Sequence, residues 1–368
     1  MIDNPAKLSE LVDRAIHADS VALDTEFKWE RTFYPQLGLI QIALSDEECY
    51  LIDPIKIDDL TPLAKLLTSK RVIKIFHDAP QDLAILSRVT KCIPTNVFDT
   101  RIAAGFSGLP CTISLANMIR ALLDIDLPKD QTRTNWLNRP LDPNQIDYAL
   151  DDVRYLRAAR ILLLTRIIVP EIKDWLKDEL SQFDDPQFYT GISDFDRFKK
   201  IAGAASLTSR SLGVLRELAA WREQEARHLD KPRGHIINDK SLIAIVRDEL
   251  RSVSDLRQSS HLSNKKVDRY GTGLIKAIET GYQLKKEDLP SIHKSLRLKA
   301  PEKKVYDRLT EFIKLKCDLQ DVDPQLVGTV TELKLLAKNI NNPGSPLPPK
   351  LTQGWRRQFL EEFYRQRF

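Results

Sequence analysis

The chain has 368 residues, of which 42% are hydrophobic and 29% are charged. This balance is typical of soluble globular proteins, and it excludes intrinsic disorder as the main state. A chain of this length exceeds one compact core, so two or three domains are expected. The longest apolar run, residues 161–169, is about half of what a membrane helix needs, so no membrane partner is expected.

Neither the start of the chain nor its cysteines indicate export. The first 20 residues have an amphipathic helical pattern with acidic side chains, which is typical of neither a signal peptide nor a transit peptide. The four cysteines are scattered without the spacing of a zinc site or a disulfide framework. We therefore expect free thiols and a cytoplasmic protein.

Charge is distributed unevenly along the sequence. Residues 1–183 contain 22 Lys and Arg against 27 Asp and Glu, whereas residues 184–368 contain 34 against 25. An acidic half joined to a basic half suggests a metal-binding catalytic module followed by a module that binds a polyanion. Two domains that merely differ in surface charge would give the same pattern.

In chain order, the first half alternates strands and helices after an opening helix. Apolar runs predict strands at residues 21–27, 38–44, 49–52, 72–76 and 97–100. Helical periodicity predicts helices at 59–69 and 79–88, and one long helix from Pro143 to about residue 165. This order predicts an α/β fold with a mixed sheet, flanking helices, and an antiparallel pair formed by 38–44 and 49–52.

The second half is predicted to be entirely helical. The sequence FDDPQFYTGISDFD, residues 183–196, interrupts the helical pattern with Pro, Gly and aromatic residues and predicts a linker. Two helical blocks follow, and the chain ends in a basic amphipathic helix after an extended loop at 341–349. The expected domains are 1–183, a linker at 184–206, and helical domains at 207–287 and 288–368.

Two acidic side chains in the first strand are the strongest functional signal. In Val21–Phe27, Asp24 and Glu26 point to one face of the strand because side chains alternate, while Thr25 points to the other. Two carboxylates about 4 Å apart repel by roughly 1 to 4 kcal/mol, depending on screening. A bound divalent cation would offset that repulsion.

Further acids lie where they could join this pair. Asp82 lies at the start of a helix that follows a buried strand, near the carboxyl edge of the sheet. Asp78 competes with it, but its position suggests a helix cap. Tyr148 and Asp152 are four residues apart, so a helix places the phenol and the carboxylate on one face. Asp151 is expected on the solvated side beside Arg154.

These segments together resemble a known enzyme family. The sequences DTE, HDAPQDL and YALDD resemble the three exonuclease motifs of the tyrosine-containing branch of the DEDD superfamily. The stretches KDQTRTNWLNRPLDPNQIDYALDDVRYL and WREQEARHLDKPRGHIINDKSL resemble ribonuclease D, in which the catalytic domain precedes one or two HRDC domains. The resemblance extends over essentially the whole chain and is weakest in the second helical block.

The resemblance implies a catalytic mechanism. It implies an RNase H-like fold with two Mg²⁺ or Mn²⁺ ions at the terminal phosphodiester. By motif position, Asp24 would contact both ions, Glu26 and Asp152 would bind the ion that carries the attacking water, and Asp82 would support the other. Tyr148 would orient that water, since an ordinary phenol has a pKa of about 10 and is a weak base at neutral pH.

Weaker predictions concern contacts with the substrate. Thr25 and Phe27 on the first strand, His77 and Lys129 are candidate substrate-binding residues, and Phe27 could stack on the terminal base. Packing explains Phe27 and His77 equally well. Arg133 and Arg139 are two further candidates for phosphate contacts. For these two and for Lys129, a position on the solvated surface is an equally good explanation. Trp136 and Trp221 are interpreted as packing residues.

The helical half has its own candidates. The resemblance implies HRDC domains, which in several families bind nucleic acid. Candidate phosphate contacts near helix ends are Lys231, Arg233, Lys265, Lys266 and Arg269. Docking of a protein partner, or fixing the geometry of the catalytic domain, is an alternative role.

The resemblance implies a 3′→5′ exoribonuclease that trims structured RNA such as tRNA precursors and releases 5′-mononucleotides. We expect a monomer without a protein partner. A 3′→5′ DNA exonuclease is the alternative within the same chemistry, because no residue in the sequence identifies a contact with the 2′-hydroxyl. An inactive nucleic-acid-binding protein is the alternative from another class, against which the complete set of acids argues.

Overall fold

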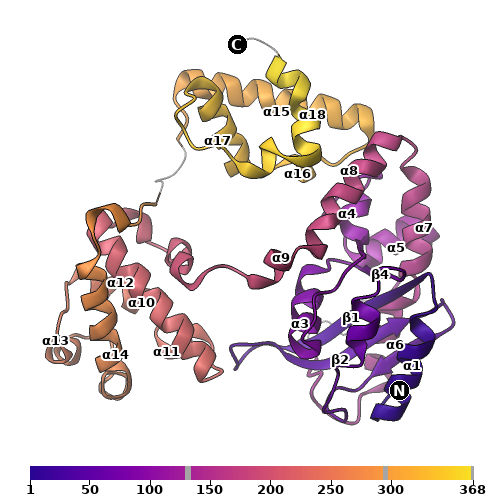
Figure 1. Ribbon diagram of the computed structural model, residues 1–368, viewed down its shortest axis with the longest axis horizontal. Helices are drawn as coiled ribbons and strands as arrows, with labels where there is room; N and C mark the ends of the chain where they lie inside the picture. The colour runs from indigo at the N-terminus through magenta and orange to yellow at the C-terminus, as the bar shows by residue number, and fades with distance from the viewer. Residues whose placement is uncertain (129–133, 293–296, 366–368) are drawn as a thin grey trace. The chain divides into compact units, whose positions relative to one another are not determined.

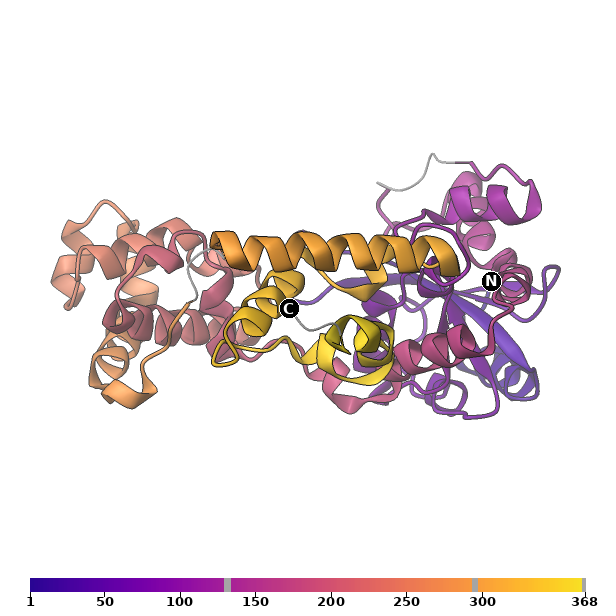
Figure 2. The same cartoon turned by 90° about the horizontal axis from the view of Figure 1, so that it is seen from above.

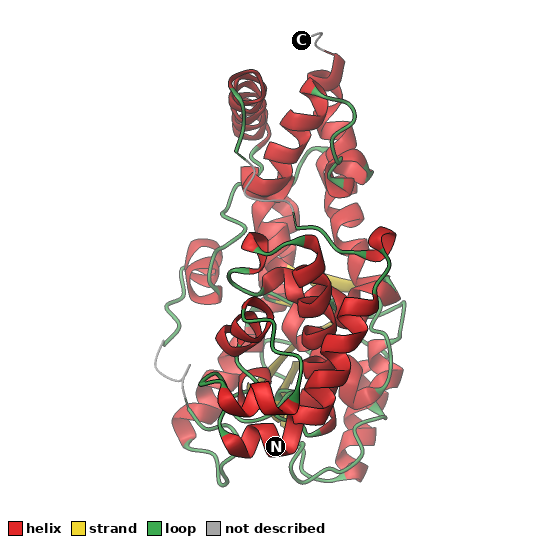
Figure 3. Cartoon of the chain, turned by 90° about the vertical axis from the view of Figure 1, so that its left-hand side faces the viewer, coloured by secondary structure: helices red, strands yellow, loops and turns green. Residues whose placement is uncertain are grey.

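A computed structural model describes residues 1–128, 134–292 and 297–365, and it divides the chain into two compact units (Figure 1). The first unit contains residues 1–28, residues 37–189 and the described residues from 297 onward. The second unit contains residues 29–36 and the described residues from 190 to 292. Helices predominate over strands (Figure 3). None of the described helices is long and apolar enough to cross a bilayer.

The first unit contains a mixed five-stranded sheet, as predicted. Its order is β3-β2-β1-β4-β5, with β1 in the centre. β1 pairs in parallel with β4, and β4 with β5, while β2 and β3 are antiparallel. The strands are β1 (Ser20–Lys28), β2 (Gln36–Ala43), β3 (Cys49–Ile52), β4 (Ile73–Phe76) and β5 (Val97–Asp99).

Each face of this sheet packs against its own set of helices. Val21 and Leu23 of β1 lie in a core that includes side chains of α1 (Pro5–Ala15), α2 (Leu63–Leu67) and α3 (Pro80–Thr90). Ala22 lies in the other core, with side chains of α4, α5, α7 and α8. Because side chains alternate along a strand, Asp24 and Glu26 follow Ala22 and Thr25 follows Leu23. The elements of that second core are α4 (Thr100–Gly105), α5 (Leu115–Leu123), α7 (Leu156–Arg166) and α8 (Pro170–Leu180).

Two predicted helices differ from those observed. The expected helix at 59–69 is reduced to α2. The expected long helix from Pro143 ends at Arg154, which closes α6 (Pro143–Arg154), and α7 begins at Leu156. No Pro or Gly marks this break. The two helices share β1 as a packing partner but differ in the others: α6 also contacts β3, whereas α7 also contacts α4, α5 and β4.

The end of the chain is helical and packs within the first unit. Its elements are α15 (Ala300–Gln320), α16 (Pro324–Val327), α17 (Val330–Asn341) and α18 (Gly354–Arg365) (Figure 2). Arg356 of α18 is buried and forms a bidentate ion pair with the buried Glu179 of α8, with an Nη2–Oε1 distance of 2.9 Å. Trp355 donates to the same carboxylate at 2.7 Å, and Arg356 also donates to the Leu326 carbonyl at 2.7 Å.

The second unit is a helical domain with a core of its own. Part of the segment predicted as a linker contributes to that core, because Phe198, Ile201 and Ala204 are buried in it. Phe33, from the loop between β1 and β2, is also part of it. The helices are α9 (Pro186–Thr190, in both units), α10 (Ser209–His228), α11 (Arg233–Ile236), α12 (Asp239–Arg247), α13 (Val253–Gln258) and α14 (Asn264–Gln283). Short 3₁₀ helices along the chain span Ser181–Asp184, Asp194–Lys200, Ala204–Ser206, Lys286–Asp288 and Pro349–Thr352.

The buried ion pair gives a stability prediction. Replacing Arg356 with Ala would leave the Glu179 carboxylate buried without its partner, and we expect a loss of about 3–5 kcal/mol in the free energy of unfolding of the first unit. Urea denaturation followed by tryptophan fluorescence measures this, because Trp175 and Trp355 stack beside the pair with ring centroids 5.6 Å apart.

The control is Arg365→Ala on the same helix. Arg365 pairs with Glu361, but its side chain is 76% exposed, so its loss should change the free energy by about 0.5 kcal/mol or less. Equal effects of the two substitutions would show that the buried pair contributes no more than a surface pair.

Candidate active site

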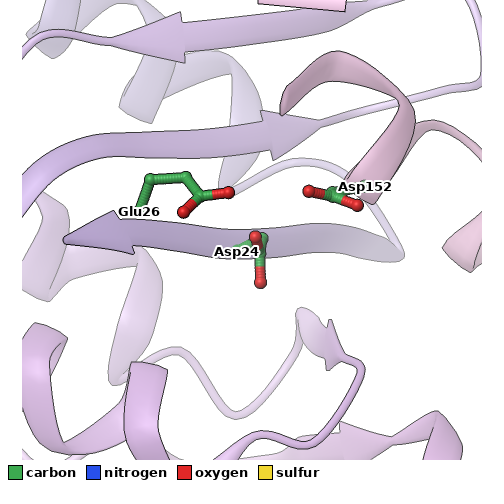
Figure 4. Close-up of side chains that lie close together, drawn as sticks. All are labelled: Asp24, Glu26 and Asp152. Carbon is green, nitrogen blue, oxygen red and sulfur yellow. The ribbon is translucent and has the colours of Figure 1, made fainter. Parts of the chain in front are cut away.

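Three carboxylates meet on the face of β1 that carries Ala22. Asp24 and Glu26 come from β1 and Asp152 from α6, and one carboxylate oxygen of each lies within 4.8 Å of the other two (Figure 4). Figure 4 shows the carboxylate of Asp152 facing the two on the strand. The structure therefore brings together two of the predicted segments as the sequence pattern indicated.

Burial and mutual repulsion make ionisation of this cluster difficult. Burial raises the pKa of Asp24 well above its ordinary value, and the charges of Asp82, Asp152 and Glu26 raise it further. For the same reasons, burial first and then Asp152 and Asp82, the pKa of Glu26 is raised to about 9. Burial, followed by the charge of Asp151, raises the pKa of Asp152 to about 7.

Asp82 approaches from the other face of β1. It lies in the first turn of α3, is 7% exposed, and accepts a hydrogen bond of 2.5 Å from the Thr25 hydroxyl. Burial raises the pKa of Asp82 to about 7, against the lowering effect of that hydrogen bond. Asp82 thus lies outside the group of three, but close enough for its charge to raise the pKa of Asp24. The Thr25 side chain is buried, and its hydroxyl already donates to Asp82.

The start of α3 is not capped in the way the sequence suggested. Asp78 was expected at the cap position, but the cap is Ala79, and Asp78 forms an ion pair with Arg101. The buried carboxylate of Asp99 accepts hydrogen bonds from the backbone N–H groups of Asp78 and Ala79, and it also caps α4. Sequence reasoning missed Asp99, although an Asp before a helix is a known capping signal.

Tyr148 lies one turn before Asp152 on α6. It is half-buried, and its hydroxyl lies close enough to the Asp152 carboxylate to influence its pKa. Burial, followed by the charges of Asp152 and Glu26, raises the pKa of Tyr148 above its ordinary value. The ring of Trp136, which is 2% exposed, packs against the phenol with centroids 6.2 Å apart. Trp136 is a packing residue as interpreted, and its position orients Tyr148.

The side chain of Arg139, suggested from the sequence as a phosphate contact, is engaged within the protein. Its Nε and one Nη2 hydrogen donate to the buried carboxylate of Asp53, at 2.8 and 2.7 Å. Its other hydrogens donate to the carbonyls of Trp136, Asn138 and Gly38. All five donors of the guanidinium are therefore used within the protein.

His77 is also held by the protein itself. Its Nδ1 lies 2.9 Å from the Thr100 hydroxyl and its Nε2 lies 3.1 Å from the Ile113 carbonyl. Burial lowers the pKa of His77 to about 4, so the ring is neutral near pH 7 and carries one N–H. That N–H donates to the Ile113 carbonyl, and Nδ1 faces the Thr100 hydroxyl, which also lies 3.0 Å from the Phe76 carbonyl. The neutral ring has no free nitrogen for a substrate, which favours the packing explanation.

The other residues singled out in the sequence lie in different environments. Phe27 is half-buried on β1 next to Glu26. Lys129 and Arg133 lie outside the described residues. Asp151 pairs with Arg154 at 2.9 Å as expected, but its side chain is only 19% exposed and is not on the solvated side. Trp221 packs against Tyr270 of the second unit.

Among the basic residues predicted near helix ends of the second unit, two are engaged in packing. Arg233 pairs with the buried Glu223 and lies over the Phe33 ring at 4.9 Å. Arg269 lies over the ring of Tyr270 at 5.3 Å. Lys231 and Lys265 are exposed, and Lys266 is half-buried.

The acidic cluster fits a divalent metal ion. Oxygen donors are the ligands preferred by Mg²⁺ and Mn²⁺. A cation among Asp24, Glu26 and Asp152 would neutralise the repulsion that raises their pKa values, which no described basic side chain does for these three. The chemistry of the donor set therefore points to divalent metal use.

Comparisons with known proteins agree with this site. A family model described as a 3′-5′ exonuclease matches residues 1–167, and an HRDC domain model matches residues 211–278. A ribonuclease D from Desulfotalea psychrophila is 47% identical over 99% of this chain and 97% of its own length. The chain belongs to the ribonuclease D family. A ribonuclease D from Bartonella henselae is 34% identical over 92% of this chain and 82% of its own length.

A solved structure supports the same assignment. The crystal structure of Escherichia coli RNase D matches with a TM-score of 0.86 and 28% identity, and covers 99% of this chain and 96% of that chain. As a member of the ribonuclease D family, the protein is a hydrolytic 3′→5′ exoribonuclease with an RNA substrate. The predicted fold class, with an exonuclease domain followed by helical HRDC structure, is confirmed.

The raised pKa values predict how stability depends on pH without metal. Asp152 is raised from 3.8 to about 7 in the folded protein. The unfolded chain therefore loses its proton first as pH rises. The free energy of unfolding should fall between about pH 4 and pH 7, and should fall further towards pH 9 through Glu26. Urea denaturation in chelator at several pH values measures this.

Asp152→Asn should reduce the decrease in the free energy of unfolding between about pH 4 and pH 7. Asp147→Asn, at an exposed position of the same helix, should leave that decrease unchanged. Adding Mg²⁺ or Mn²⁺ should stabilise the native enzyme most at the higher pH values, because the folded carboxylates bind metal when they are ionised. A pH profile that Asp152→Asn leaves unaltered would contradict the assigned environment of this carboxylate.

Proposed function

We propose that this ribonuclease D trims the 3′ trailers of tRNA precursors and similar structured RNAs by two-metal-ion hydrolysis, releasing 5′-mononucleotides. The observation that carries the proposal is the convergence of Asp24, Glu26 and Asp152, with Asp82 adjacent, on one end of β1. The Escherichia coli relative is described as an exoribonuclease involved in structured RNA processing, which supports the substrate class.

In the proposed site, Asp24 would contact two divalent ions, Mg²⁺ or Mn²⁺. Glu26 and Asp152 would bind one of them, and Asp82 would support the other. When bound, such ions stabilise charge on a phosphodiester and make water more acidic. Asp82 is buried and the other three carboxylates are half-buried, so their interactions with the phosphodiester are less screened than they would be in bulk solvent.

Tyr148 is proposed to orient the attacking water. Its raised pKa keeps the phenol protonated near neutral pH, so it would act as a hydrogen-bonding group and not as the base. Trp136 restricts the ring through packing, and α6 carries Tyr148 and Asp152 on the same face, one turn apart. Tyr148 is thereby aimed at the carboxylate cluster before substrate binds.

The proposal also covers contacts with the substrate, the cellular location and the oligomeric state. The backbone of Thr25 and the ring of Phe27, both on β1 beside the acids, are proposed to contact the terminal nucleotide, with His77 in a supporting position and Lys129 as a phosphate contact. The scattered free cysteines support a cytoplasmic location. We propose a monomer that acts without a protein partner.

The substrate class can be tested directly. We expect the purified enzyme with Mg²⁺ or Mn²⁺ to shorten a tRNA transcript with a 3′ extension, and to release mononucleotides that chromatography identifies. A DNA oligomer of matched sequence should be degraded more slowly. Chelator or Asp24→Asn should remove the activity.

Two outcomes would overturn the proposal. Faster degradation of the DNA oligomer would replace the RNA assignment with a DNA exonuclease. Undiminished activity of Asp24→Asn, in a preparation free of other nucleases, would remove this carboxylate from the site.

The role of Tyr148 gives a kinetic prediction. Tyr148→Phe keeps the packing against Trp136 but loses the hydroxyl, so kcat should fall by about 10- to 100-fold while KM changes little. The control is Tyr155→Phe, at the end of the same helix. A change confined to KM would assign Tyr148 to substrate binding.

A further inference from the structure

The second unit contains a cavity that the nuclease site does not use. Its volume is about 490 Å³, within the range of small-molecule sites. Its walls come from the segment before α10, from α10 itself, from α11 and from the start of α12. The cavity lies entirely within residues 197–240, so one helical domain forms it alone.

Positive charge predominates in this cavity. Five cationic and two anionic side chains line it. The two acids are already neutralised: Asp239 pairs with Arg222 at 2.7 Å, and Glu223 pairs with Arg233 and lies 3.6 Å from Arg197. The remaining cations of the lining are Lys200 and Lys240.

These two lysines are available for a ligand. Both are exposed, and neither forms an ion pair or a hydrogen bond through its side chain with any part of the chain that the structure describes. Lys240 lies in the first turn of α12, a helix of 9 residues whose N-terminus opens on the cavity through Asn238. The side chain of Asn238 already accepts from the Ser241 N–H, so the N–H groups of Asp239 and Lys240 are the ones at this helix N-terminus that can donate to an anion.

Below the two lysines, the charged groups of the lining are held by one another. Arg222 is 4% exposed and Glu223 is fully buried. The Nε of Arg197 faces the Oε2 of Glu223 at 3.6 Å, so these two atoms are ion-pair partners. The paired groups fix the walls of the cavity and leave Lys200 and Lys240 as the charges of its lining that have no partner in the described structure.

We propose that this cavity is a second ligand site, which binds the phosphate group of a nucleotide. Lys200, Lys240 and the N-terminus of α12 bind the phosphate. The arginines below supply further positive potential, since a guanidinium matches the geometry of phosphate oxygens. The cavity is much larger than one phosphate, and the aliphatic parts of Arg and Lys together with Ile201 form walls for the attached nucleoside.

The phosphate can belong to a free mononucleotide or to a nucleotide within an RNA strand. Calorimetric titration of the full-length protein separates these sources. The probes are AMP, adenosine, inorganic phosphate and a short oligoribonucleotide. Chelator in the buffer prevents hydrolysis and leaves the nuclease carboxylates without metal, so that they repel phosphate.

The test uses a double variant, Lys200→Gln with Lys240→Gln, and a matched control, Lys276→Gln with Lys286→Gln, at exposed positions of the same unit. Both remove two positive charges, and melting temperatures check the fold. We expect AMP or the oligoribonucleotide to bind the wild type with one site, and the cavity variant to lose affinity by about tenfold. The control should change by about twofold or less, because its charges act only through the screened long-range field.

The outcomes are distinct. Binding of AMP that inorganic phosphate competes away supports a free nucleotide as the ligand. Binding of the oligoribonucleotide alone, with the same sensitivity to the cavity variant, supports a nucleotide within a strand. Equal binding of adenosine and AMP, equal losses in both variants, or no binding of any phosphate-containing probe would overturn the proposal. None of these outcomes depends on nuclease activity.

Discussion

The fold holds several carboxylates close together against their mutual repulsion, and the arrangement of the proposed active site depends on this. Asp24 and Glu26 are fixed on the central strand of the sheet, and α6 brings Asp152 to the same place. The pKa values of all three are raised, because burial and mutual repulsion make their ionisation unfavourable without a cation. Stability elsewhere must offset that cost, and the two cores on either side of β1 provide it through burial of apolar side chains. The proposed active site thus lies where the fold holds unfavourable charge together.

The groups that aim these acids are mostly neutral or already paired. Tyr148 is oriented by Trp136, whose backbone lies so close to Gly38 that a Cβ at that glycine would be 2.7 Å from the Trp136 carbonyl oxygen. Arg139 ties the same loop to the buried Asp53. Neither residue brings an unpaired positive charge to the acidic cluster, because Trp136 is neutral and Arg139 is paired with Asp53. The site keeps its negative potential for metal ions while its side chains stay ordered.

Local sequence rules were sufficient for the strands, the sheet class and the pairing of Asp24 with Glu26, because alternation along a strand depends only on adjacent residues. They also placed Tyr148 above Asp152, since helical spacing is equally local. They failed where tertiary packing decides. The break between α6 and α7 has no Pro or Gly to mark it, and the contribution of Phe198 to the core of the second unit was hidden inside an apparent linker. The role of Arg139 could not be predicted because its partner Asp53 is 86 residues away.

The basic second half shows why counting charges overestimates an anion-binding surface. Arg356, in the closing helix that was predicted as basic, is buried against Glu179 and serves packing. Arg233 is likewise committed to Glu223. A guanidinium paired in this way costs desolvation on both sides and presents little net charge to a ligand. The charge that remains for recognition is the charge left after internal pairing, and in the cavity of the second unit that remainder is concentrated on Lys200 and Lys240, beside a helix N-terminus. A nucleotide phosphate would meet those lysines without breaking any ion pair of the domain.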